Sequence, residues 1–209
     1  MLADVTNYVM LELGQPMHAF NNALVKSTDV DNVAKDTEFT TLDNEKRVLP
    51  KDTMVIKGNG EISAIAGIMG GLDSEITLDT TSVLIEAACF KSSKVRKTAT
   101  ALGLRTEASA RYEKSLDPNY ADIAIKRYIK LLRDNDEGIE VSSNLTDVYP
   151  TVLEEGHITL SKELLTKYLP KELVHMNQDL KKENASQLEM KEVSQELLAI
   201  DRAIGLSYC

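Results

Sequence analysis

The sequence of 209 residues contains no tryptophan, only two cysteines and only three histidines. Cys89 and Cys209 lie far apart along the chain, so they do not form the framework of a disulfide-rich domain. The histidines, at positions 18, 157 and 175, show no metal-ligand spacing with each other or with the cysteines. We therefore expect a protein of a reducing compartment, the cytoplasm, that binds no metal and keeps Cys89 in its core.

Long apolar runs are also missing: none could span a bilayer, and none resembles the core of a signal peptide. Basic residues are outnumbered, since 24 Lys and Arg stand against 33 Asp and Glu, for a formal net charge of −9. An autonomous nucleic-acid-binding protein normally carries a net basic surface. If RNA is a ligand, most of it must therefore be held by other parts of an assembly.

The hydrophobic content of 43% is enough for one core, or for one domain with an appendage. Residues 4–13 are predicted to form a helix stopped by Gly14 and Pro16. Turn residues at Asp43-Asn44 and at Gly58-Asn59-Gly60 then indicate two β-hairpins. A glycine-rich turn and a nearly apolar strand follow them. The predicted strands span residues 37–42, 46–49, 53–57, 61–66 and 82–88.

Helical periodicity comes next, with predicted helices at 94–101, 107–114 and about 121–132. Residues 141–148 are expected to form a returning strand. Near residue 150 the composition shifts toward Lys, Glu, Leu and Gln, which indicates a helical extension over 151–209. The sequence thus predicts an α+β fold, with a mixed β-sheet core and flanking helices over residues 1–150, followed by a helical C-terminal tail.

Three blocks of sequence stand out: VTNYV and ELGQPMHAF within residues 5–20, AGIMGG and LIEAACF within 66–90, and GLRTEAS and RYEK within 103–114. In that order and at those separations they resemble the editing, tRNA-binding module of the beta subunit of bacterial-type phenylalanine–tRNA ligases. The family usually has Asp where this chain has Asn21 and Gly where it has Ser115. The module starts upstream in the family, so we expect an N-terminally truncated piece, and residues 157–169 resemble the opening of the next domain.

The resemblance implies a hydrolase that removes tyrosine wrongly attached to the phenylalanine tRNA. The implied partners are the acceptor end of tRNA(Phe), tyrosine or phenylalanine, and the alpha subunit of a heterotetrameric ligase. By the same resemblance we expect no membrane partner and a cytoplasmic location. It also implies no cofactor in this chain, because in the family ATP and Mg²⁺ serve aminoacylation at the alpha subunit.

Glu86 interrupts an otherwise apolar strand, and a lone buried carboxylate is costly unless it has a partner. A site that hydrogen-bonds a hydroxyl discriminates well against an analogue that lacks it, whereas an apolar pocket alone does not. By resemblance, Glu86 reads the tyrosine hydroxyl. The alternative from the pattern alone is an outward-facing Glu on a half-exposed strand.

Three further residues receive roles from the resemblance. His18, expected in a loop after a helix end, would lie at the ester bond and orient water or the tRNA end; the alternative is a structural histidine. Thr106 would contact the substrate and Ala108 would leave room for its ring. Ordinary helix chemistry explains the last two equally well, with Thr106 as N-cap and Ala108 as a helix former.

Asn7, Pro16, Gly67 and Gly70 are weaker candidates for substrate binding, and turn geometry is the alternative for both glycines. The most basic stretch of this acidic chain is a candidate for contact with the tRNA acceptor end or, equally, a solvated helix surface. Its cations are Arg96, Lys97, Arg105, Arg111 and Lys114.

Two other functions stay open at this point. One is a non-catalytic, RNA-binding scaffold module of the same subunit, which the acidic charge and the unassigned tail favour. The other is a free-standing domain that binds a small aromatic amino acid.

Overall fold

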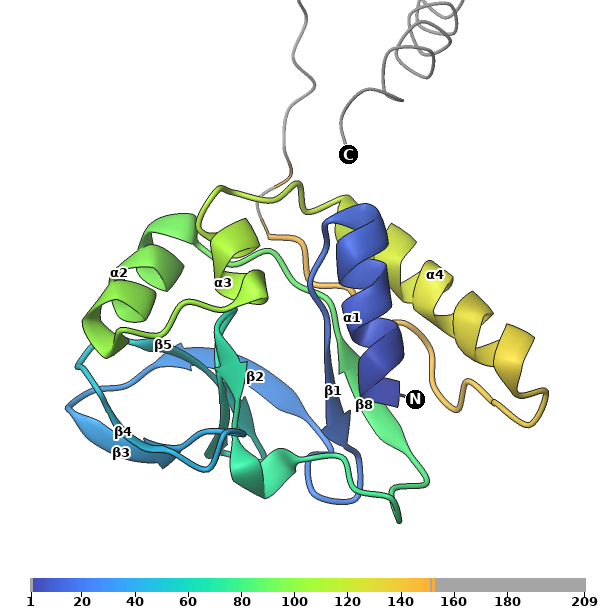
Figure 1. The fold of residues 1–209 in the computed structure, drawn as a ribbon, viewed down its shortest axis with the longest axis horizontal. Coiled ribbons are helices and arrows are strands. Elements are labelled where there is room, and N and C mark those ends of the chain that lie inside the picture. The colour runs from blue at the N-terminus through green and yellow to red at the C-terminus, as the bar shows by residue number, and fades with distance from the viewer. Residues whose placement is uncertain (1, 151, 153–209) are drawn as a thin grey trace, which may run out of the picture. The chain divides into compact units, whose positions relative to one another are not determined.

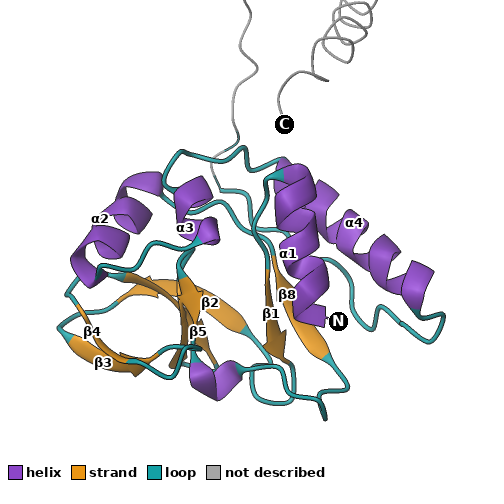
Figure 2. Cartoon of the chain, viewed as in Figure 1, coloured by secondary structure: helices purple, strands orange, loops and turns teal. Residues whose placement is uncertain are grey.

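The computed structural model describes residues 2–150 and residue 152 (Figure 1). Figure 2 shows helices beside antiparallel strands, which confirms the predicted α+β class. The helices are α1 (Leu2–Leu13), α2 (Ser92–Leu102), α3 (Glu107–Tyr112), α4 (Tyr120–Asn135) and the short 3-10 helix η1 (Leu72–Ser74). The strands are β1 (His18–Asn21), β2 (Thr28–Asn32), β3 (Thr37–Thr40), β4 (Lys46–Leu49), β5 (Met54–Gly58), β6 (Glu61–Ile65), β7 (Met69–Gly70) and β8 (Val83–Glu86).

The strands form three separate sheets, and none of these sheets is mixed as we expected of the β core. Their orders are β2-β5-β6-β7, β3-β4 and β1-β8, and every strand pair among the described residues is antiparallel. Short turns join β3 to β4 and β5 to β6, and such turns permit only antiparallel pairing because a parallel pair needs a long crossover.

The β1–β8 pair separates two hydrophobic cores. Successive side chains of a strand point to opposite faces. Phe20 and Leu84 accordingly pack into the core that the larger sheet shares with α2 and α3. Ile85, one position along, packs instead against the core between α1 and α4, with Val9 and Tyr128 at its centre. Figure 1 shows the pair running between the sheets and these two helices.

Glycine ends two of the helices as the sequence predicts. Gly14 follows α1 with φ +76°, and Gly103 follows α2 with φ +60°, in the left-handed region where glycine costs least. The N–H of Gly14 donates to the Met10 carbonyl at 2.9 Å. The chain therefore leaves α1 sharply and enters β1 within a few residues.

The helices predicted between residues 4 and 132 and the two hairpins are confirmed, whereas other local expectations differ from the structure. No strand forms at 141–148, and the short strands β1 and β2 were not predicted. Cys89 is exposed, not in the core, and its thiol donates to the Leu116 carbonyl at 3.0 Å. His18 begins a strand and does not lie in a loop.

Residues 2–150 fall within one compact unit, Met1–Pro150. The extension predicted for 151–209 lies outside the described residues, as does the stretch 157–169. In the part of the chain that the structure describes, no helix has the length and apolar character needed to cross a membrane.

Candidate functional site

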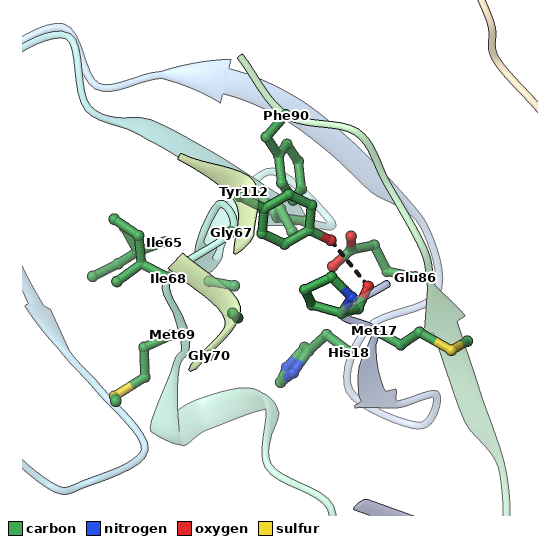
Figure 3. A pocket seen from close by; sticks show the side chains of 14 residues that line it. Met17, His18, Ile65, Gly67, Ile68, Met69, Gly70, Glu86, Phe90 and Tyr112 are labelled. Carbon is green, nitrogen blue, oxygen red and sulfur yellow. Dashed lines mark hydrogen bonds between the residues drawn. The ribbon is translucent and has the colours of Figure 1, made fainter. Parts of the chain in front are cut away.

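A pocket of about 350 Å³, counting the space open to solvent at its mouth, lies among β1, β8, the turn after β6 and α3. Figure 3 shows the side chains around it. Its lining residues are Pro16, Met17, His18, Ile56, Ala64, Ile65, Gly67, Ile68, Met69, Gly70, Glu86, Phe90, Ala108 and Tyr112. The walls are thus largely apolar, with polar groups from His18, Glu86 and Tyr112.

The register of the β1–β8 pair places His18 directly opposite Glu86. Opposite residues of an antiparallel pair project their side chains on the same face. Both side chains line the pocket, and Figure 3 shows them entering it from neighbouring strands. Two candidate residues that are remote in sequence are therefore brought together by one strand pairing.

Glu86 is half-buried as a residue, but its Oε1 is shielded from solvent and has no hydrogen-bond partner among the described residues. Loss of solvation raises the pKa of Glu86 to about 8. Near neutral pH the carboxyl is then mostly protonated, so it can donate one hydrogen bond and accept others. An apolar pocket with one unpaired carboxyl is suited to a ligand that carries a hydroxyl.

Burial has the opposite effect on His18, whose pKa it lowers to about 4. The imidazole is therefore neutral at physiological pH. It packs edge-on against Phe20, with ring centroids 4.4 Å apart. Its nitrogens form no hydrogen bond with the residues that the structure describes, which leaves them available to water or to a ligand.

The glycine-rich turn gives the pocket its space. A Cβ at Gly70 would lie 2.6 Å from Cε1 of His18, so a side chain there would displace the imidazole. Gly67 has φ +70°, and a Cβ there would lie 3.0 Å from the rings of both Phe90 and Tyr112. Both glycines line the pocket, and both have a structural requirement as well.

Thr106 is not among the lining residues. It is the N-cap of α3, accepting a hydrogen bond from the Ser109 N–H at 3.1 Å within a capping box. Its hydroxyl donates to the Ile68 carbonyl at 2.9 Å. Thr106 thus fastens the glycine-rich turn to the helix that carries Ala108, and any direct contact with a substrate stays a prediction.

Of the other predicted site residues, Pro16 and Ala108 line the pocket, whereas Asn7 lies on the exposed surface of α1 and outside it. Tyr112 and Phe90 also line the pocket. Neither was predicted as a site residue, although both belong to the blocks that carry the resemblance. Nothing in periodicity separates an aromatic residue of a pocket wall from one of a core.

The basic stretch is only partly neutralised. Arg105 pairs with Glu113 at 3.0 Å and Arg111 with Glu107 at 2.6 Å. The exposed cations Arg96, Lys97 and Lys114 form no ion pair with the described residues. Within the same residues, no cluster of three or more His, Cys, Asp or Glu could hold a metal ion.

Comparison with known proteins gives consistent matches. The profile of the B3/4 domain matches residues 1–137. The phenylalanine–tRNA ligase beta subunit of Clostridium acetobutylicum is 44% identical over 170 residues, which cover 80% of this chain and 21% of that protein. The beta subunit of Halalkalibacterium halodurans is 37% identical over 209 residues, 99% of this chain and 23% of the relative. The chain thus spans about a fifth of the length of these curated relatives.

Proposed function

This chain belongs to the B3/4 domain family, and from that premise we propose that its pocket binds the tyrosine of Tyr-tRNA(Phe) for hydrolysis of the aminoacyl ester. The observation that carries the proposal is the unpaired Oε1 of Glu86 in a largely apolar pocket. Apolar walls suit an aromatic ring, and the hydroxyl of tyrosine would give the carboxyl the partner that it lacks. Phenylalanine would leave the carboxyl unpaired, which costs free energy.

The reaction itself is the attack of water on the ester carbonyl carbon. The new C–O bond forms as the bond to the ribose oxygen breaks, and that leaving oxygen takes up the proton that the water loses to become the ribose hydroxyl. A histidine with a pKa of about 4 is a weak base at neutral pH. We therefore assign to His18 the orientation of the water through a ring nitrogen, and to Thr106 the support of the turn beside it.

The basic stretch supports the tRNA acceptor end as partner. Phe90 and Tyr112 line the pocket, and the stretch with its unpaired cations lies between and just beyond them in sequence. A phosphate backbone that reached the pocket would pass cations in an otherwise acidic chain. In the longer protein we propose an alpha subunit as partner, with ATP and Mg²⁺ used there, and a cytoplasmic location.

The second candidate function is a non-catalytic scaffold module that contacts RNA or neighbouring domains. The net charge of −9 favours it, because an acidic chain holds RNA poorly by itself. A chain that binds tRNA but leaves Tyr-tRNA(Phe) intact would have this function.

The test is deacylation of Tyr-tRNA(Phe) and Phe-tRNA(Phe) by the full chain and, separately, by a longer beta subunit that contains it, assembled with its alpha subunit. We expect faster loss of tyrosine than of phenylalanine, and loss of this preference in Glu86→Ala, which has no group to hydrogen-bond the hydroxyl. Glu38→Ala, at an exposed strand residue, is the matched control. Equal rates for both esters in the assembled protein would contradict the proposal.

A further inference from the structure

Two buried side chains, Gln15 and Tyr112, connect the walls of the pocket. The Tyr112 hydroxyl donates to the Pro16 carbonyl at 3.0 Å, the bond drawn as a dashed line in Figure 3. Nε2 of Gln15 lies 3.1 Å from the same carbonyl, 2.9 Å from the Ala88 carbonyl and 3.5 Å from the Tyr112 hydroxyl. Gln15 is 1% exposed and Tyr112 is 3% exposed, so these contacts form out of reach of solvent.

These hydrogen bonds join the three segments that carry the pocket's polar groups. Pro16 comes two residues before His18, and Ala88 comes two residues after Glu86. Tyr112 lies on α3, the helix that also contributes Ala108. The contacts of Gln15 and Tyr112 thus sit where β1 begins and β8 ends, and they hold both strand ends against α3.

The same contacts also occupy the hydroxyl of Tyr112 as a hydrogen-bond donor. Burial, and next the charge of the nearby Glu86, raise the pKa of Tyr112 well above its usual range, so the phenol keeps its proton. The phenol donates its hydrogen bond to the Pro16 carbonyl. Oε1 of Glu86 stays without a partner although a phenol lies close by. If Tyr112 turned its hydroxyl to Glu86, it would take the place of a phenol on a ligand.

We propose that Gln15 and Tyr112 are positioning residues that set the spacing of His18 and Glu86 and keep the Glu86 carboxyl free for the phenolic hydroxyl of a ligand. The identity of that ligand rests on the proposed function, whereas the arrangement of the walls does not. Neither residue touches the reacting atoms in this account; both act through the segments that they hold.

The test compares L-tyrosine and L-phenylalanine binding to the full chain by calorimetry. Tyr112→Phe keeps the ring and removes the hydroxyl, and Gln15→Met keeps the length and removes the amide. Tyr128→Phe is the matched control, because Tyr128 is 1% exposed and its hydroxyl donates to the Leu2 carbonyl at 3.4 Å in the other core. We expect each pocket variant to lower the preference for tyrosine roughly tenfold. The affinity for phenylalanine should stay within about threefold, and the control should change neither.

A second readout follows the Glu86 carboxyl by ¹³C NMR during a pH titration and needs no ligand. Loosened walls would admit water, so the pKa of Glu86 should fall in both pocket variants from about 8 toward its ordinary value. An unchanged Glu86 titration in both variants would overturn the positioning role. So would equal losses of tyrosine and phenylalanine affinity, which a merely structural role predicts. A wild type that prefers neither amino acid would overturn the proposed function, and the titration would still decide the role of Gln15 and Tyr112.

Discussion

On one side of the β1–β8 pair, α1 and α4 enclose a core in which the polar groups have partners. Within it Thr6 donates to the Ala3 carbonyl at 2.7 Å and Tyr128 donates to the Leu2 carbonyl at 3.4 Å. At its solvent-exposed edge Arg127 donates two hydrogen bonds of 2.7 Å to Glu12. On the other side the same two strands present His18 and Glu86 to the pocket, both desolvated, with Oε1 of Glu86 unpaired.

The difference separates stability from function within one fold. The side facing α1 and α4 follows the rule that buried polar groups are hydrogen-bonded, whereas the pocket breaks it at a residue whose partner a ligand could supply. Exceptions of this kind are expected at functional sites. Substitutions on the α1–α4 side should therefore change stability alone, whereas substitutions in the pocket should change ligand binding.

The largest effect is expected from Glu86→Leu. It should reduce the preference for tyrosine about 100-fold, because the only unpaired carboxyl of the pocket is lost. It should also raise the free energy of unfolding by about 1–3 kcal/mol, since a buried polar atom without a partner disappears. Urea denaturation at pH 7 and amino-acid titration measure both. Glu38→Leu on an exposed strand is the control, and a destabilised Glu86→Leu would show that Glu86 has a partner in the free protein.

A smaller effect is expected from Gly70→Ala, whose methyl group would meet the imidazole of His18. Crowding of a packed site costs about 1–3 kcal/mol, and displacement of His18 should slow deacylation. Gly138→Ala is the comparison, because its methyl group would approach only the flexible side chain of Asp136, at 3.1 Å. Thermal unfolding of both variants gives the difference, and equal melting temperatures would contradict the packing of His18 on Gly70.

The pH dependence of stability should separate Glu86 from His18. The folded pKa of Glu86, about 8, lies above its ordinary value of 4.5, so the folded state holds a proton that the unfolded state has lost. Stability should fall as pH rises from 4.5 to 8 and then level off. The folded pKa of His18 is about 4, below its ordinary value of 6.5. Its contribution to the free energy of unfolding therefore rises as the pH rises from 4 to 6.5. Of these two groups, only Glu86 makes stability depend on pH between pH 6.5 and 8.

In that last window the free energy of unfolding should fall by about 1–2 kcal/mol, because one bound proton changes it by up to about 1.4 kcal/mol per pH unit. Urea denaturation at pH 6.5 and 8 measures the fall. Glu86→Gln should remove it, and an equal fall in that variant would assign it to another group.

The smallest effect is expected from Glu12→Gln on the α1–α4 side. Both side chains of the Glu12–Arg127 pair are 31% exposed, so solvent screens the pair and its loss should lower stability only slightly. Amino-acid binding should not change, since α1 and α4 do not line the pocket. Urea denaturation and titration of this variant together show whether the two sides are independent; a loss of tyrosine preference would mean that they are coupled.

Local patterns in the sequence predict the hairpins and helix ends, because short-range interactions determine these elements. The turns at Asp43-Asn44 and Gly58-Asn59-Gly60 fixed two hairpins, and Gly103 ended a helix as expected. Thr106 was recognised as a possible N-cap, which the capping box confirms. The strand expected at 141–148 does not form; all eight residues are exposed, so no buried face stabilises an extended segment there.

The pocket depended on pairing between remote segments, which local patterns do not encode. β1 has only four residues and was assigned to a loop, so the register that sets His18 against Glu86 was not foreseen. The contacts of Gln15 with Ala88 and Tyr112 likewise cross long stretches of chain. The resemblance to a family pointed to several of the lining residues, and only the fold shows that Thr106 and Asn7 lie outside the lining.

The most direct test is a titration of the full chain with tyrosine and with phenylalanine, followed by backbone amide NMR shifts and repeated with Glu86→Ala. We expect tyrosine to shift the signals near Glu86 and His18, phenylalanine to do so far less, and the variant to lose the difference. Well-dispersed spectra that respond equally to both amino acids, or to neither, would contradict a pocket built to read the tyrosine hydroxyl.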